Sequence, residues 1–306
     1  EFRRVLFRSE VLGGDEEYLD EVREAASGWV LEPDGAALAH EKEQVAKLFA
    51  GLIDDTDRVA DRVRRQAVEE TRRQTYQAME ALIANLNTMN SRAGAQTPFS
   101  SINYGTDTSP EARMVMHCLL EATEAGLGGG ETAIFPIQIF RVQKGVNLDD
   151  DDPNHDLFRL ACRVSAKRLF PNFSFQDAPF NAEYYVPGHP ETEIAYMGCR
   201  TRVMSNVHDP SRAQTWGRGN LSFTSINLPR LAIEANHDVN AFFTSFDRMI
   251  DLVIDQLLDR LKIQSHKLVR NFPFLMGQGV WIGSENLGPD DAVAEVLEHG
   301  TLSVGF

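Results

Sequence analysis

The stretch Gly217-Arg218-Gly219-Asn220-Leu221-Ser222-Phe223-Thr224-Ser225-Ile226-Asn227-Leu228-Pro229-Arg230 does most to indicate the fold. A Gly-x-Gly turn leads into residues that alternate like a β-strand, in which successive side chains point to opposite faces. Asn220, Ser222 and Thr224 are therefore predicted on one side, where they suit a pocket wall and a solvated strand face equally well. The glycines precede a strand and not a helix, so this is no dinucleotide-binding fingerprint.

A second informative stretch is Met197-Gly198-Cys199-Arg200-Thr201-Arg202, which follows the apolar run Ile194–Met197. Gly198 allows a sharp turn, so Cys199 is predicted at a loop tip, where positioned reactive groups often occur. Spacing alone leaves a reactive and a structural thiol equally open. Cys118 and Cys162 fall on apolar faces of predicted helices, which predicts buried structural thiols for both.

Outward from these stretches, hydrophobic periodicity predicts long helices over 37–89, either two or one broken near 54–57. Pro136 lies inside a predicted strand and suggests a bulge or an edge position there. Further strands are predicted over 99–104, 133–142, 173–176, 194–197, 221–226, 279–282 and 300–306, and helices over 109–125, 155–169, 240–266 and 290–298. Strands that alternate with helices predict an α/β fold, of which a barrel is one form.

Composition limits the classes of function. The 306 residues carry a formal net charge of −15, which argues against a general nucleic-acid binder, while a local pocket for a small anion stays open. No apolar run is long enough to cross a bilayer and no signal peptide is evident, so we expect a cytoplasmic protein without membrane contact. The three cysteines and eight histidines are scattered, which predicts no metal site within the chain.

Taken together, these stretches resemble the anaerobic (class III) ribonucleoside-triphosphate reductases, in particular their large catalytic subunit. The resembling segments follow one another in a single order and are 85–108, 121–140, 157–177, 195–203, 217–230, 271–283 and 299–306. So many long runs in one order make the resemblance specific.

The resemblance implies a ten-stranded α/β barrel, incomplete here, with a central finger loop and flanking long helices. It implies reduction of ribonucleoside triphosphates to 2′-deoxyribonucleoside triphosphates, with Cys199 as the thiol that becomes a thiyl radical. The remaining family positions imply Asn220 as a second catalytic residue and Met197, Ser222, Thr224, Thr301 and Ser303 as substrate-binding residues.

The resemblance also implies parts that this chain does not contain. Residues 1–9 resemble the translation of a sequencing adapter, so residues 10–306 are interpreted as a partial barrel domain. Missing are the N-terminal ATP-binding module, an upstream cysteine strand, and a C-terminal glycyl-radical loop with a zinc site. Implied partners are a radical-SAM iron–sulfur activating enzyme, formate or a thiol reductant, nucleotide effectors and a second copy of the chain. Alone, this polypeptide is expected to be inactive.

Two other interpretations remain open. Another glycyl-radical enzyme, related to pyruvate formate-lyase, would share the barrel and finger loop but bind a pyruvate-like acid. A non-catalytic nucleotide-binding or dimerisation scaffold would bind triphosphates without turnover, even with both ends restored.

The complete reading frame in the source DNA is expected to encode a strand cysteine upstream of Gln74. Downstream of Phe306 it is expected to encode a glycyl-radical loop with a cysteine-rich site. Amplification and sequencing outward from the codons of these two residues tests this. A stop codon directly after Phe306, with no upstream cysteine strand, would contradict the reductase interpretation and favour the scaffold.

Overall fold

The structure is a computed structural model that describes residues 29–48, 50, 55–89, 97–198 and 201–306. Residues 1–9 and Cys199 lie outside the described residues. The chain divides into two compact units, residues 1–177 and 178–306, and each is described by itself.

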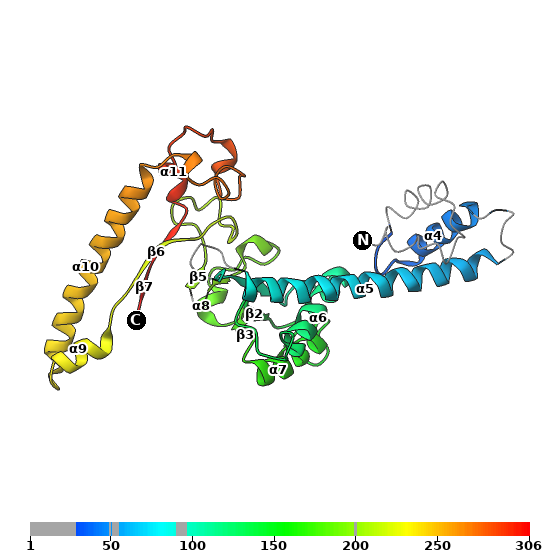
Figure 1. The fold of residues 1–306 in the computed structure, drawn as a ribbon, viewed down its shortest axis with the longest axis horizontal. Helices are drawn as coiled ribbons and strands as arrows, with labels where there is room; N and C mark the ends of the chain where they lie inside the picture. Colours follow the sequence, from blue (N-terminus) through cyan, green and yellow to red (C-terminus); the bar gives the residue numbers. More distant parts are fainter. Residues whose placement is uncertain (1–28, 49, 51–54, 90–96, 199–200) are drawn as a thin grey trace. The chain divides into compact units, whose positions relative to one another are not determined.

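The first unit combines long helices with a small parallel sheet (Figure 1). Its sheet has the strand order β1-β2-β3, with all three strands parallel. The elements are α4 (Gly35–Leu48), α5 (Thr56–Thr88), β1 (Ser101–Tyr104), α6 (Pro110–Ala125), β2 (Ile137–Val142), α7 (His155–Arg168) and β3 (Asn172–Phe175).

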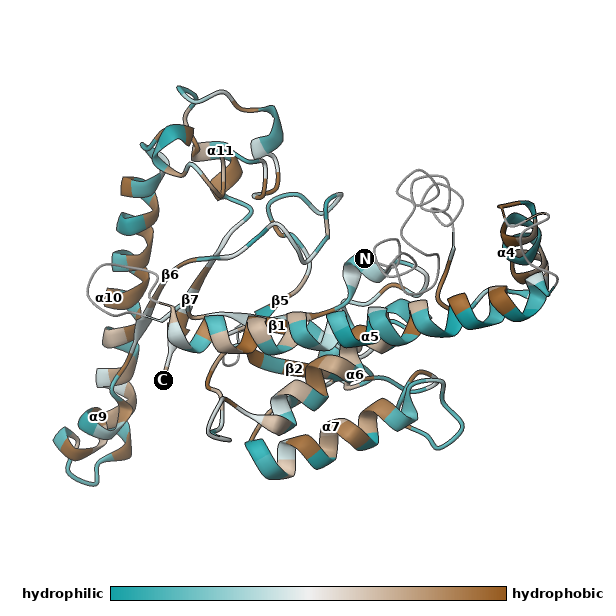
Figure 2. Ribbon diagram, turned by 45° about the vertical axis from the view of Figure 1, so that its right-hand side comes forward, coloured by the Kyte–Doolittle hydropathy of each residue, from teal (hydrophilic) through white to brown (hydrophobic). Residues whose placement is uncertain are grey.

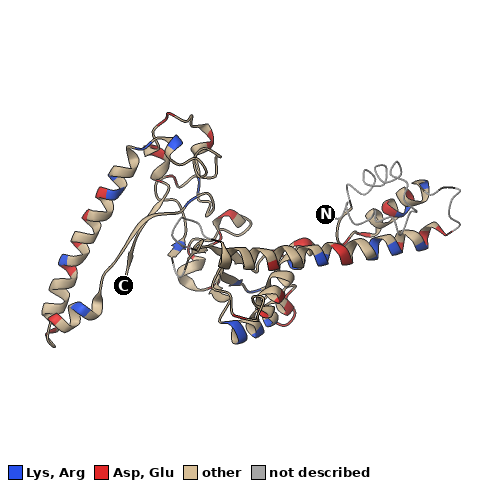
Figure 3. Cartoon of the chain, in the orientation of Figure 1, with Lys and Arg blue, Asp and Glu red and all other residues tan. Residues whose placement is uncertain are grey.

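Helices α4 and α5 confirm the prediction of two long helices in this region. The Asp55 side chain accepts a hydrogen bond from the Arg58 backbone amide and caps the start of α5. Charged residues of both signs line α5 up to Glu80, and the last two turns carry none (Figure 3). A buried ion pair between Glu41 of α4 and Arg64 of α5 joins the two helices, and Arg64 also donates to the carbonyls of Val30 and Leu31.

Strand β2 is the central strand of the sheet, so the prediction of an edge or bulged position is wrong. Pro136 immediately precedes the first paired residue, Ile137, whose amide donates to the Ser100 carbonyl at 2.9 Å. The missing proline donor therefore falls outside the ladder and costs no sheet hydrogen bond.

The core of the first unit forms where β2 meets α6 and α7. Phe140 is fully buried there, against the apolar stripe of α7 that includes Leu157 and Val164. Cys118 of α6 is buried, as predicted. Cys162 is exposed, which contradicts the prediction, because its position on α7 turns away from that stripe toward solvent.

The second unit contains a hairpin, a two-stranded parallel sheet and one long helix (Figure 1). Its elements are α8 (Pro179–Ala182), η2 (Pro190–Thr192), β4 (Ala195–Met197), β5 (Thr201–Val203), β6 (Asn220–Ser225), α9 (Leu228–Glu234), α10 (Val239–Ser265), η3 (Val269–Asn271), η4 (Ser284–Asn286), α11 (Ala294–Leu297) and β7 (Thr301–Gly305).

Helix α10 supports the β6–β7 sheet and confirms the predicted amphipathic helix over 240–266. Asp238 caps its start by accepting from the amides of the next turn. Val253 and Leu257 are buried and pack in one cluster with Leu302 and Val304 of β7. Apolar and polar positions alternate along α10 (Figure 2), as expected for a helix that packs on one side only.

The segment between α10 and β7 differs from its prediction. Residues 279–282 form turns and no strand, because Gly279 adopts a positive φ of 65° and the Trp281 amide bonds back to the Leu275 carbonyl. Trp281 and Ile282 are instead buried in a compact apolar cluster. The helix predicted over 290–298 shortens to α11.

The described residues therefore confirm a mixed α/β protein with small parallel sheets, and no barrel is seen among them. None of the described helices combines the length and the apolar character needed to span a membrane.

Replacing Gly105 by alanine is expected to destabilise the first unit by about 3 kcal/mol. Gly105 has a φ of 127°, and a Cβ there would lie 2.6 Å from the Arg141 backbone oxygen. Gly128→Ala is the matched control, since a Cβ at Gly128 meets nothing within 4 Å. Urea unfolding followed by circular dichroism measures both changes, and equal effects of the two substitutions would contradict the steric argument.

Candidate functional site

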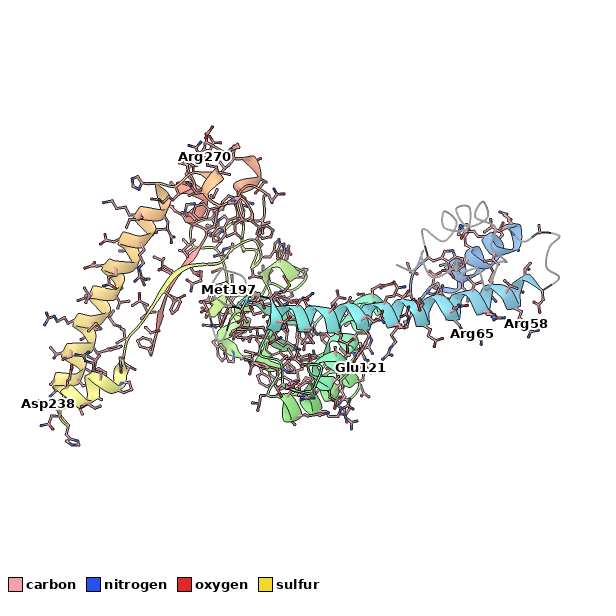
Figure 4. All side chains as sticks on the ribbon, in the orientation of Figure 1. Arg58, Arg65, Glu121, Met197, Asp238 and Arg270 are labelled. Atoms are coloured by element: carbon pink, nitrogen blue, oxygen red, sulfur yellow. The ribbon has the colours of Figure 1, made fainter. Side chains whose placement is uncertain are left out.

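The hairpin formed by β4 and β5 presents the predicted reactive segment. The strands are antiparallel, with Met197 aligned with Thr201 and Ala195 aligned with Val203. Cys199 lies between them in the sequence and outside the described residues. Met197, predicted to line the pocket, is partly buried at the end of β4 (Figure 4).

Side chains at the base of the hairpin fix it to α8. Ile194 and Val203 are almost completely buried. The Arg202 Nη1 donates to the Phe180 carbonyl at 2.8 Å and to Asn181 Oδ1 at 3.1 Å. Its guanidinium also lies over the Phe180 ring, 5.3 Å from the centroid, in a cation–π contact. These contacts indicate a hairpin with a fixed stem.

Strand β6 carries a bulge that changes the predicted arrangement of its polar residues. Asn220 is aligned with Thr301, but Ser222 is aligned with Leu302, so Leu221 is the extra residue. Leu221 packs beside Gly300, where a Cβ would lie 2.6 Å from the Leu221 Cγ. Asn220 therefore does not continue the strip formed by Ser222 and Thr224.

Ser222 and Thr224 lie on the face of the sheet that packs against α10. They are aligned with Leu302 and Val304, which belong to the α10 cluster. Arg260 of α10 donates from one nitrogen to both hydroxyls, at 3.1 Å each, and to the Phe223 carbonyl at 3.1 Å. Both hydroxyls thus have a partner within the protein.

The opposite face of the sheet brings together three of the predicted site residues. Thr301 is aligned with Asn220 and Ser303 with Phe223, and aligned residues of a parallel pair share a face. Asn220 is exposed and Phe223 has 66% of its surface exposed, so this face is open in the second unit. An amide, two hydroxyls and an aromatic ring are groups that can bind a polar ligand with an apolar surface.

Sequence analysis missed a polar network beside this face. Asn206 is 1% exposed, and its Oδ1 accepts from the Asp209 amide at 3.2 Å, which sets the orientation of its side-chain amide. Its Nδ2 therefore faces His299 Nδ1 at 2.8 Å and donates to it. His299 must then be neutral, and burial lowers the pKa of its imidazole accordingly.

Arg218 is the second member of this network. It donates to the carbonyls of Ser205, Gln214 and His299 at 2.8 to 3.2 Å, and burial lowers its pKa. The signal in the sequence is an arginine held between Gly217 and Gly219, directly before the predicted strand.

The described part of the chain contains two thiols, Cys118 and Cys162. Burial raises the pKa of the Cys118 thiol, and partial desolvation by its neighbours raises the pKa of Cys162 although that residue is exposed, so neither described thiol is activated as a thiolate. Within the described part of the chain, no group of three histidine, cysteine or acidic side chains could hold a metal ion.

The fold and this site define an α/β protein in which a short hairpin and a polar parallel strand pair present the candidate residues. A sequence profile described as anaerobic ribonucleoside-triphosphate reductase matches residues 39–306. The chain therefore belongs to the anaerobic ribonucleoside-triphosphate reductase family.

Individual relatives agree with this family. The chain is 32% identical over 241 residues to the anaerobic ribonucleoside-triphosphate reductase of Salmonella typhimurium, covering 78% of this chain and 32% of that protein. It is 31% identical over 270 residues to the enzyme of the same name from Enterobacteria phage T4, covering 86% of this chain and 43% of that protein. The chain thus spans less than half the length of these relatives.

The buried neutral His299 predicts a loss of stability as the pH falls. Its folded pKa is lowered below the ordinary value of 6.5, so the unfolded state binds more protons and stability rises with pH. The contribution is present above about pH 6.5 and is lost as the pH falls through the folded pKa.

Urea unfolding at pH 5.5 and pH 7.5 measures this effect. The His299→Gln variant is expected to show a smaller difference between the two pH values than the unsubstituted chain. His40→Gln, at an exposed position of α4, is the control and should leave the difference unchanged. An unchanged difference in His299→Gln would contradict the assignment.

Proposed function

We propose that the complete polypeptide reduces ribonucleoside triphosphates to 2′-deoxyribonucleoside triphosphates by anaerobic radical chemistry. The observation that carries this proposal is the register of β6 and β7, which gathers Asn220, Thr301 and Ser303 on one open face. Family membership and the names of the relatives support the choice of substrate class.

Cys199 is proposed as the thiol that, as a thiyl radical, removes the 3′ hydrogen atom of the ribose. The 2′ hydroxyl then takes up a proton and leaves as water, the 2′ carbon gains a hydrogen from the reductant, and the abstracted hydrogen atom returns from the thiol to the 3′ carbon. A glycyl radical, installed by a radical-SAM enzyme, supplies the unpaired electron. Formate, oxidised to carbon dioxide, or a thiol pair, oxidised to a disulfide, supplies the two electrons of the reduction.

The polar residues of β6 and β7 are proposed to bind the substrate or to support the strand that does so. Asn220 offers both a donor and an acceptor, which suits a ribose hydroxyl or the small reductant. Thr301 and Ser303 share its face and are proposed to approach the substrate phosphates, while Met197 lines the pocket from the hairpin. Ser222 and Thr224 bond to Arg260 and are proposed to hold β6 in place from the other face.

The strand pair also supports the proposed barrel. Parallel sheets occur almost only with both faces covered, whereas β6 and β7 form a pair whose one face carries the exposed Phe223. We propose that in the complete protein these strands belong to a ten-stranded α/β barrel and that the β4–β5 hairpin is its finger loop. The long helices α4 and α5 are proposed, by family analogy, as the face for a second copy and a nucleotide effector.

Substitution of the proposed site residues in the complete, anaerobically activated protein tests the function. Cys199→Ser is expected to abolish turnover, because a serine O–H bond is too strong for the hydrogen transfer. Asn220→Ala is expected to lower turnover about 100-fold through the lost hydrogen bonds. Formation of deoxyribonucleotides from each ribonucleoside triphosphate is the measurement.

Cys162→Ser is the matched control, because this thiol is exposed on α7 in the other unit. It should retain the turnover of the unsubstituted protein. Full turnover by Cys199→Ser would contradict the thiyl assignment. Triphosphate binding without any turnover in the unsubstituted protein would favour a nucleotide-binding scaffold.

A further inference from the structure

Arg218 occupies a junction between segments that are distant in sequence. Its Nε donates to the His299 carbonyl at 2.9 Å, and its Nη1 donates to the Ser205 carbonyl at 2.8 Å and the Gln214 carbonyl at 3.2 Å. All three acceptors are backbone oxygens. Arg218 itself lies two residues before Asn220.

Two of these carbonyls lie next to the strands of the candidate site. Ser205 comes two residues after the end of β5, and His299 comes two residues before the start of β7. One guanidinium therefore joins the end of the hairpin to the starts of both strands that carry Asn220 and Thr301.

The chemistry of the group suits this task. A guanidinium is planar and always charged, and its donors form a rigid fork that fixes several acceptors at once. No carboxylate is among the hydrogen-bond acceptors recorded for Arg218 in the described structure, so it does not act there as a member of an ion pair. Arg218 is half-buried, and partial desolvation of a charge against carbonyls alone costs free energy, which points to a requirement for that geometry.

We infer that Arg218 is a positioning residue, which holds the stem of the β4–β5 hairpin in a fixed place relative to Asn220 and Thr301. This inference rests on the proposed function, in which a residue of the hairpin and Asn220 act on the same ribose. Its effect on the reaction is through alignment, since a misplacement of about 1 Å can cost about 100-fold in rate.

Other contacts hold the same backbone without Arg218. The Thr301 amide donates to the Gly219 carbonyl at 3.0 Å, and the Ile282 amide donates to the Gly217 carbonyl at 2.7 Å. Asn206 and His299 form a second link between the hairpin side and β7. A variant at Arg218 is therefore expected to fold while its junction loosens.

The test compares Arg218→Gln and Arg218→Lys in the complete protein with Arg230→Gln as the matched control. Arg230 is exposed on α9 and pairs with Glu234 one turn away, so its loss should change nothing at the site. Arg218→Gln is expected to lower kcat about 100-fold with an unchanged KM for the ribonucleotide. Arg218→Lys should recover part of kcat, because it keeps the charge but not the fork.

Hydrogen exchange measures the junction independently of turnover. In Arg218→Gln, peptides over 201–206 and 298–302 are expected to exchange at least about fivefold faster. The peptide over 224–228 should be unchanged, because the Ile226 amide bonds to Gly305 at the far end of the sheet.

The outcomes separate this inference from the proposed function. Wild-type kcat and exchange in Arg218→Gln would overturn the positioning role while leaving the reductase intact. Faster exchange in only one of the two peptides would also overturn it, since the inference requires a joint between them. Faster exchange in both peptides, with no deoxyribonucleotide formed by the unsubstituted protein, would support the positioning role of Arg218 and refute the proposed reductase function.

Discussion

The single extra residue in β6 determines which side chains of the candidate site can act together. Leu221 interrupts the ladder between Asn220 and Ser222, and the register with β7 shifts by one residue. Asn220 therefore shares a face with Thr301, while the two hydroxyls that follow turn to α10. Gly300 makes this possible, because a side chain there would collide with Leu221.

The rest of the second unit keeps that register in place from both sides. On the face that packs against α10, Arg260 holds β6 through two hydroxyls and a carbonyl. Arg218 and the Asn206–His299 pair hold the turn before β6 and His299, two residues before β7. Polar contacts fix irregular backbone here because turns provide few backbone hydrogen bonds of their own.

The first unit rests on regular elements. Phe140 lies on β2, the middle strand of its parallel sheet, and is fully buried in the core. The helices pack on this sheet through apolar stripes. The buried pair of Glu41 and Arg64 adds a specific link between α4 and α5. Truncation of one partner would leave a buried charge, which is why such pairs are sensitive to substitution.

The sequence by itself determined the long amphipathic elements and the family. The period of apolar residues predicted α5, α6, α7 and α10 close to their observed bounds, because helices of this length bury a stripe that repeats along the chain. The sequence also identified Asn220 and Thr301 as candidate site residues, through motifs that resemble those of the family. The sequence did not predict short irregular segments correctly: residues 279–282 were predicted as a strand and form turns.

Only the tertiary structure decided which face each candidate occupies. Alternation along β6 predicts that Asn220 and Ser222 point the same way, but a bulge is defined by hydrogen bonds to a partner strand about 80 residues away, and no local pattern contains them. Likewise, two of the carbonyls that Arg218 binds, those of Ser205 and His299, lie 13 and 81 residues away in the sequence. Local periodicity reports the elements that form, whereas long-range packing and pairing fix the orientation of their side chains.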